Sequence, residues 1–142
     1  MEAQNVLTVA YFTKRLGDLC LRSGLSGLPR DEASRHVLFT SMVGALPVAT
    51  PLVQAAVDTC LARWIETSGL KDLDHVTLRR SLVDAGYLDR PADGSSYSVV
   101  ANPPGRPRCE AGVAGVDLAA VLQSRREEVA RRKAEYLARS GT

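Results

Sequence analysis

Three arginines in one segment of the chain carry side chains well suited to binding phosphate groups. Arg79 and Arg80 are adjacent in a run of helix-forming residues, and Arg90 ends a short β-prone run. A guanidinium group keeps its charge at physiological pH and donates paired hydrogen bonds to phosphate oxygens. Arg79, Arg80 and Arg90 are therefore candidate phosphate contacts, and plain solvation is the alternative for Arg80.

A second group of cations lies near the C-terminus. Residues 125–139 hold six basic and three acidic side chains, so this segment could neutralise phosphates without reading base sequence. Two alternatives are a solvated helix with weak Glu–Arg pairs one turn apart, and a helix that pairs with a partner or a second copy. The candidate phosphate contacts here are Arg125, Arg126, Arg131, Arg132 and Lys133.

Residue patterns typical of catalytic or metal sites are missing. Neither His36 nor His75 has a ligand-type residue three or four positions after it, and Cys20, Cys60 and Cys109 are widely spaced, whereas metal sites use closely spaced ligands. We expect no enzymatic activity, no metal and no cofactor. Two of the thiols fall on apolar helical faces, and Cys109, in a stretch rich in proline and glycine, is expected to be the more exposed.

The net charge of +2 identifies no partner, because 18 basic side chains nearly balance 16 acidic ones. The distribution is less even. Residues 1–50 hold five basic and four acidic side chains, residues 51–100 five and seven, and residues 101–142 eight and five. No apolar run is long enough for a membrane helix, and charges interrupt the first twenty residues. We expect a cytoplasmic protein with no membrane contact.

Hydrophobic spacing predicts five helices and one hairpin. The helices are expected over residues 4–22, 29–45, 51–67, 73–85 and 116–139. Residues 87–90 and 97–100 are β-prone runs separated by an Asp-Gly turn, which predicts a β-hairpin. The stretch between the hairpin and the last helix is rich in proline and glycine and predicts an extended connector.

Three helices followed directly by a hairpin predict a winged helix-turn-helix-like domain. The expected fold class is mainly α with a small β-hairpin, with an extra N-terminal helix and a C-terminal helix. The expected division is an N-terminal helix and loop in residues 1–28, the winged-helix-like domain in 29–100, the connector in 101–115 and a basic C-terminal helix in 116–142.

The helix predicted over residues 73–85 offers Arg79 two alternative roles. At 100° per residue, Arg79 falls between two apolar strips, so its guanidinium group is expected to be covered. A covered guanidinium requires a carboxylate partner. The alternative to a DNA contact is therefore a structural clamp between Arg79 and one of Asp84, Asp89 or Asp93.

The remaining face of this helix is acidic. It is predicted to carry Asp74, Thr77, Ser81 and Asp84, with Arg80 at its rim. Phosphates would repel the two carboxylates, which counts against a simple DNA-binding helix.

The stretch from Asp74 to Arg90, with the following Asp93-Gly94-Ser95-Ser96-Tyr97, resembles the bacterial family catalogued as domain of unknown function 2087. The pattern of that family is close to D-x-x-T-L-R-R-x-L-V-D-x-G-L-L-x-R, followed by D-G-x-x-Y. The resemblance implies a winged-helix-type protein related to transcriptional regulators. The third predicted helix is longer here than the pattern implies and lacks its threonine-rich entry.

Three classes of function follow from these observations. The first, which follows the resemblance, is a cytoplasmic transcriptional-regulator-like protein that binds duplex DNA as a homodimer. The second is a protein-interaction module on the same scaffold that does not bind nucleic acid. The third is a small-molecule sensor, which would need an apolar cavity near Trp64 and Tyr87.

Overall fold

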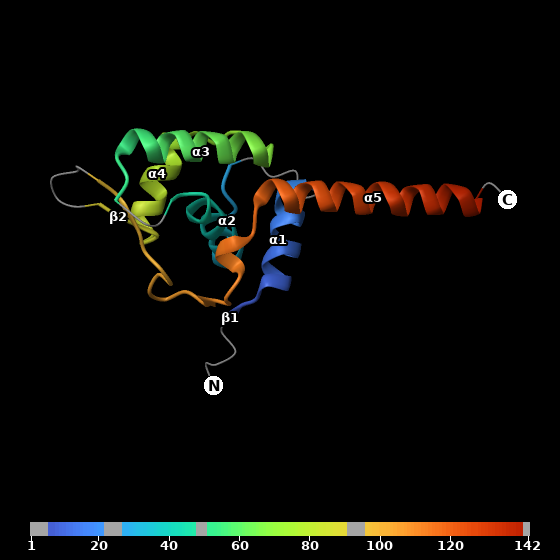
Figure 1. Cartoon of the computed structure of the whole chain (residues 1–142), viewed down its shortest axis with the longest axis horizontal. Coiled ribbons are helices and arrows are strands. Elements are labelled where there is room, and N and C mark those ends of the chain that lie inside the picture. Colours follow the sequence, from blue (N-terminus) through green and yellow to red (C-terminus); the bar gives the residue numbers. More distant parts are fainter. Residues whose placement is uncertain (1–5, 22–26, 48–50, 91–95, 141–142) are drawn as a thin grey trace.

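The computed structural model describes residues 6–21, 27–47, 51–90 and 96–140 of the chain (Figure 1). Within these ranges the helices are α1 (Val9–Leu21), α2 (Glu32–Gly44), α3 (Gln54–Ser68), α4 (His75–Asp84) and α5 (Leu118–Ser140). The strands are β1 (Val6–Leu7), β2 (Leu88–Asp89), β3 (Ser98–Val99) and β4 (Arg108–Cys109), and a 3-10 turn, η2, spans Val113–Gly115. The mainly helical class with a small hairpin is therefore confirmed.

Local side-chain chemistry sets the ends of the central helices. Asp31 accepts a hydrogen bond from the Ser34 amide at 2.9 Å and caps α2, and Asp74 accepts one from the Thr77 amide at 2.9 Å and caps α4. Hydrogen bonds from Ser34 and Thr77 lower the pKa of these two carboxyl groups below their ordinary values. Gly69 ends α3 at a φ of 71°, which a residue with a Cβ adopts only with strain.

The first helix starts later than predicted. Val6 and Leu7 form β1, and the hydroxyl of Thr8 accepts a hydrogen bond from the Tyr11 amide at 3.1 Å, so α1 begins at Val9. The remaining predicted helices agree with the structure to within a few residues at each end.

The predicted hairpin forms a small antiparallel sheet. Strands β2 and β3 pair antiparallel, and Leu52, between α2 and α3, pairs with Tyr97 through two backbone hydrogen bonds of 2.8 and 2.7 Å. The sheet order is therefore Leu52, then β3, then β2. The predicted Asp-Gly turn lies outside the described residues.

A second sheet was not predicted. Strand β1 pairs in parallel with β4, although their sequence positions differ by about one hundred residues. The carboxylate of Glu110 accepts a hydrogen bond from the Val9 amide at 2.7 Å, and the Glu110 amide donates to the Leu7 carbonyl at 2.9 Å. Residues 101–115 are therefore not a plain extended connector, because they contain β4 and η2 and tie the first strand to the body.

One cluster of buried apolar side chains runs from Leu7 to Leu122 and includes residues of every helix. Helix α5 contributes Leu118 and Leu122 to this core, whereas residues 129–140 are all exposed. Figure 1 shows the outer half of α5 extending away from the helical body. The first turns of α5 therefore pack against the body, and its outer turns do not.

Candidate nucleic-acid interface

Arg79 is a covered cation held by a neighbouring helix. Its side chain is 11% exposed and forms an ion pair with Asp58 of α3, whose side chain is 23% exposed. The partner is therefore Asp58, and not Asp84 or Asp89, while Asp93 lies outside the described residues. Helix α3 packs directly against α4, so it meets the covered side of Arg79. This ion pair leaves little of the guanidinium group for DNA.

The exposed face of α4 carries charges of both signs. Thr77, Arg80 and Asp84 are exposed, together with the capping residue Asp74, whereas Ser81 is half-buried. Arg80 therefore belongs to the exposed face. Ser81 was predicted on that face but is half-buried. The face is less acidic than the sequence predicts.

The three arginines of the first group line one pocket. This pocket, of about 350 Å³, lies between the start of α3, α4 and the hairpin. Its lining residues are Gln54, Arg79, Arg80, Val83, Asp84, Arg90 and Tyr97. The Arg90 guanidinium carbon lies 6.0 Å from the centre of the Tyr97 ring, at the outer limit of a cation–π contact.

Two of these arginines keep their charge available. Arg80 and Arg90 are exposed and form no ion pair with another described residue. Arg79 is neutralised by Asp58. As far as the described residues go, the pocket therefore offers two unpaired guanidinium groups, from α4 and from the hairpin, beside the carboxylate of Asp84.

Arg125 does not belong to the exposed cations of α5. Its guanidinium group pairs with Asp18 at 2.5 Å and donates to the Lys14 carbonyl at 2.9 Å, so it joins α5 to α1. Gly17 permits this contact, since an added Cβ would lie 2.6 Å from Arg125 Nη1. The structure therefore gives Arg125 partners on α1, and the phosphate contact expected there stays a prediction.

The other cations of α5 are exposed at a different end of the molecule. Arg132 pairs with Glu128 of the same helix at 3.1 Å, whereas Arg126, Arg131 and Lys133 form no ion pair within the described ranges. In Figure 1 the hairpin lies at one end of the long axis and the free end of α5 at the other. The two predicted groups of phosphate contacts therefore do not form one continuous surface.

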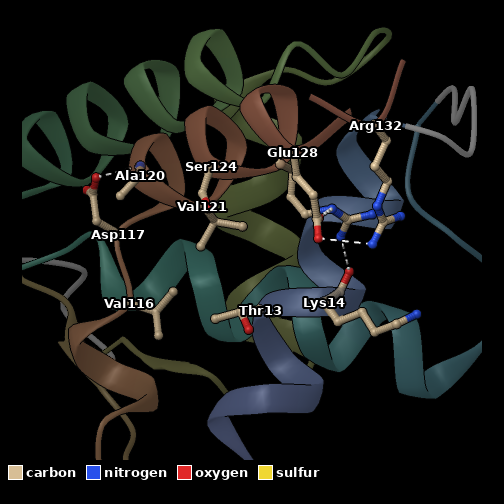
Figure 2. A pocket seen from close by; sticks show the side chains of 10 residues that line it. Thr13, Lys14, Val116, Asp117, Ala120, Val121, Ser124, Glu128 and Arg132 are labelled. Atoms are coloured by element: carbon tan, nitrogen blue, oxygen red, sulfur yellow. Dashed lines mark hydrogen bonds and ion pairs between the residues drawn. The ribbon is translucent and has the colours of Figure 1, made fainter. Parts of the chain in front are cut away.

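A groove of about 740 Å³ separates α1 from α5 (Figure 2). Thr13 and Lys14 line it from α1, and Val121, Ser124 and Glu128 are among its α5 residues. Figure 2 shows the ion pair between Glu128 and Arg132, which both belong to the α5 wall of the groove. The groove is open and carries charges of both signs, so it favours neither an anionic nor a cationic ligand.

A buried polar cluster around His36 could not be predicted from the spacing of residues. His36 Nδ1 lies 2.6 Å from the Tyr87 hydroxyl, and Nε2 lies 3.1 Å from the Pro107 carbonyl. Because a carbonyl only accepts, Nε2 carries the proton and Nδ1 accepts from Tyr87. Arg106 lies 5.0 Å from the Tyr87 ring centre and pairs with Glu32 at 3.3 Å.

This cluster fixes the segment after the hairpin onto α2. Burial lowers the pKa of His36 and raises the pKa of Tyr87 to about 12. Both groups are therefore neutral at pH 7. The arrangement positions the chain, and the Thr40 hydroxyl also lies 3.5 Å from His36 Nδ1.

A smaller pocket of about 250 Å³ lies beside Trp64, between α2, α3 and the start of α5. Tyr87 does not line it, so Trp64 and Tyr87 do not share this cavity, and a sensor site common to both lacks support. Cys60 lines this pocket, and all three thiols are half-buried, including Cys109, which was expected to be the more exposed. Burial raises the pKa of Cys20 to about 11 and also raises that of Cys109.

The described part of the chain contains no cluster of three His, Cys, Asp or Glu side chains placed to hold a metal ion. Among the same residues, no helix combines the length and apolar character that crossing a membrane requires. The expectation that the chain is not an enzyme stays a prediction.

Comparison with known proteins identifies one bacterial family. The sequence model of the family described as uncharacterized protein conserved in bacteria (DUF2087) matches residues 24–99, more than half of the 142 residues. The matched stretch contains α2, α3, α4 and the hairpin. No curated protein and no solved structure gives a significant match.

Proposed function

We propose that this chain, which belongs to the bacterial DUF2087 family, binds duplex DNA through a winged-helix scaffold formed by α2, α3, α4 and the hairpin. The observation that carries the proposal is the pocket in which Arg80 of α4 and Arg90 of the hairpin face the same open space. In this proposal the two guanidinium groups bind backbone phosphates on either side of a groove that α4 enters.

The order of elements supports the winged-helix part of the proposal. A helix, the Leu52 bridge, two helices and two strands follow one another, and the sheet order is Leu52, β3, β2. In this arrangement α4 is the second helix of the helix-turn-helix and the hairpin is the wing. Residues from both elements then face the same side, as the pocket requires.

The charge balance of this surface indicates weak, phosphate-dominated binding. Asp74, Asp84 and Asp89 are exposed near Arg80 and Arg90, so the surface has no excess of positive charge. Non-specific affinity on the order of 10–100 µM at physiological salt is expected for few phosphate contacts. The proposal leaves α5 outside this interface, because its free cations lie at the other end of the molecule.

A second function, a protein-interaction module that does not bind nucleic acid, is favoured by the same three carboxylates. A partner with basic side chains would pair with Asp74 and Asp84 on α4. The homodimer and the cytoplasmic location stay predictions under either function.

Fluorescence anisotropy of a labelled random-sequence duplex, titrated at two salt concentrations, separates the two functions. The proposal predicts binding that weakens steeply with salt and that Arg80→Ala and Arg90→Ala each reduce several-fold. Arg63→Ala is the matched control, because Arg63 is an exposed arginine of α3 that does not line the pocket. Absence of binding at low salt, or an equal loss in the control, would refute DNA binding at this surface.

A further inference from the structure

The outer half of α5 carries an apolar stripe that no described residue covers. Three of the large exposed apolar side chains of the protein lie there: Val129 is 56% exposed, Tyr136 64% and Leu137 56%. At 100° per residue, these three fall on one side of the helix. Residues 129–140 are all exposed, so the stripe lies beyond the part of α5 that packs against the body.

Basic side chains lie on the same side of α5 as this stripe, and the acidic side chains of the outer helix lie on other sides. Arg126 and Lys133 fall with the three apolar residues inside an arc of about 100° of the helix surface. Both are exposed and form no ion pair with another described residue. Each of the three acidic residues of the outer helix lies about 80° or more outside the arc. These residues are Glu127, Glu128 and Glu135.

A hollow adjoins the stripe where α1 ends. It has a volume of about 660 Å³, and its lining includes Leu21 of α1 with Val129 and Ala130 of α5. Its charged lining residues are Arg125, Arg126, Glu128 and Arg132. Arg125 pairs with Asp18 and Arg132 with Glu128, so Arg126 is the lining cation without an ion pair to another described residue. The hollow therefore places apolar side chains of α1 and α5 beside the guanidinium group of Arg126.

We propose that the stripe formed by Val129, Tyr136 and Leu137, with Arg126 and Lys133, binds an acidic amphipathic helix of a partner protein. The apolar side of such a helix would cover the stripe and the hollow, and its carboxylates would pair with the two free cations. This inference goes beyond the proposed function, because the stripe lies at the opposite end of the molecule from Arg80 and Arg90.

Charge decides between this occupant and two others. A second copy would bring the same cations, Arg126 and Lys133, against each other, and the arc contains no carboxylate to balance them. Duplex DNA would match the cations but would leave Val129, Tyr136 and Leu137 in contact with water or phosphate. Of these three occupants, only an acidic partner with an apolar side satisfies both parts of the stripe.

The first experiment uses a fluorescent peptide of leucine and glutamate with leucine at heptad positions a and d. Two controls accompany it: a scrambled peptide of the same composition, and a peptide with lysine in place of glutamate. The proposal predicts that the acidic amphipathic peptide binds the full chain about tenfold or more tightly than either control. Equal binding of the scrambled peptide, or no binding, would overturn it.

Matched variants then locate the site. Lys133→Glu and Leu137→Ser should each weaken peptide binding about tenfold. Arg131→Glu makes the same charge change on the acidic side of the helix, and Ala138→Ser changes a neighbouring exposed residue; both should bind as the wild type does. The site residues are solvent-exposed, so circular dichroism should show unchanged folding. Equal effects in the two sets would refute the assignment.

Two further measurements test the other occupants. Sedimentation equilibrium should show that Leu137→Ser leaves the oligomeric state unchanged, and vesicles of phosphatidylcholine and phosphatidylglycerol should not retain the protein. A dimer disrupted by Leu137→Ser, or vesicle binding lost with that variant, would contradict a protein partner. The Arg80→Ala and Arg90→Ala variants should bind the peptide normally, which distinguishes failure of this proposal from failure of DNA binding.

Discussion

Replacing Arg79 with methionine should lower the free energy of unfolding by about 2–3 kcal/mol. Methionine keeps much of the length of the side chain and removes the charge, so the effect reports mainly on the ion pair with Asp58. Leaving one partner of a fully buried pair alone costs about 3–5 kcal/mol. Asp58 is 23% exposed and so keeps some hydration. The expected loss of about 2–3 kcal/mol is therefore smaller than the loss for a fully buried pair.

The assay is urea unfolding followed by the fluorescence of the single tryptophan, Trp64, which is 3% exposed and sits in the core. A loss of 2–3 kcal/mol corresponds to a decrease of roughly 10 °C in Tm for a chain of this size. Arg80→Met is the control, since exposed substitutions usually change stability by less than about 0.5 kcal/mol.

A double-mutant cycle with Asp58→Asn isolates the pair from other effects. The proposed ion pair predicts that the double variant loses less stability than the two single variants together, by at least about 1 kcal/mol. Additivity to within about 0.5 kcal/mol would refute the pairing and would return Arg79 to the set of available DNA contacts.

Three further predictions follow from the helix contacts and the buried polar groups. Gly17→Ala should destabilise the fold by about 1–2 kcal/mol. The new Cβ would lie 2.6 Å from Arg125 Nη1 and would disturb the pair between Arg125 and Asp18. Increased stability in urea unfolding would contradict this, because it would show that Arg125 moves aside freely. The pKa of His36 is lowered by burial, so the unfolded state binds the proton first and stability should fall as pH drops below about 6.5. His36→Gln should remove this dependence of the free energy of unfolding on pH. An unchanged pH dependence in the variant would show that His36 does not cause it. Cys20, with its pKa raised to about 11 by burial, should react with iodoacetamide at pH 8 more than tenfold slower than free cysteine; similar rates by mass spectrometry would disprove its protection.

Local patterns in the sequence were sufficient to predict the helices and the hairpin. Leu78 and Leu82 recur at a helical interval, and both are fully buried in α4. Asp74 and Gly86 mark the two ends of the same helix, through a capping hydrogen bond and a positive φ of 88°. These signals depend only on neighbours within about one turn of the chain.

Contacts between distant segments could not be predicted in the same way. Strands β1 and β4 have two residues each and therefore show no alternation that a sequence pattern could reveal. Arg125 meets Asp18 across 107 positions. Only the packing of α1 against α5 brings these two charges together.

The sequence predicted which arginines lie at the candidate site, but not which carboxylate pairs with Arg79. Arg80 and Arg90 were identified as possible phosphate contacts, and they line one pocket. The partner of Arg79 was sought on α4 and the hairpin, whereas it comes from α3, because the packing of two helices decides which carboxylate reaches a covered guanidinium. A helical pattern predicts which side of α4 is covered, but not what covers it.

The most direct test of the account is the salt dependence of DNA affinity in the wild type and in the double variant Arg80→Ala/Arg90→Ala. Each phosphate contact contributes about 0.9 to the slope of log Kd against log salt. If both guanidinium groups bind phosphates, the double variant should have a slope smaller by roughly 2 and a weaker affinity at every salt concentration. Equal slopes, or no binding by the wild type at low salt, would contradict DNA binding through α4 and the hairpin.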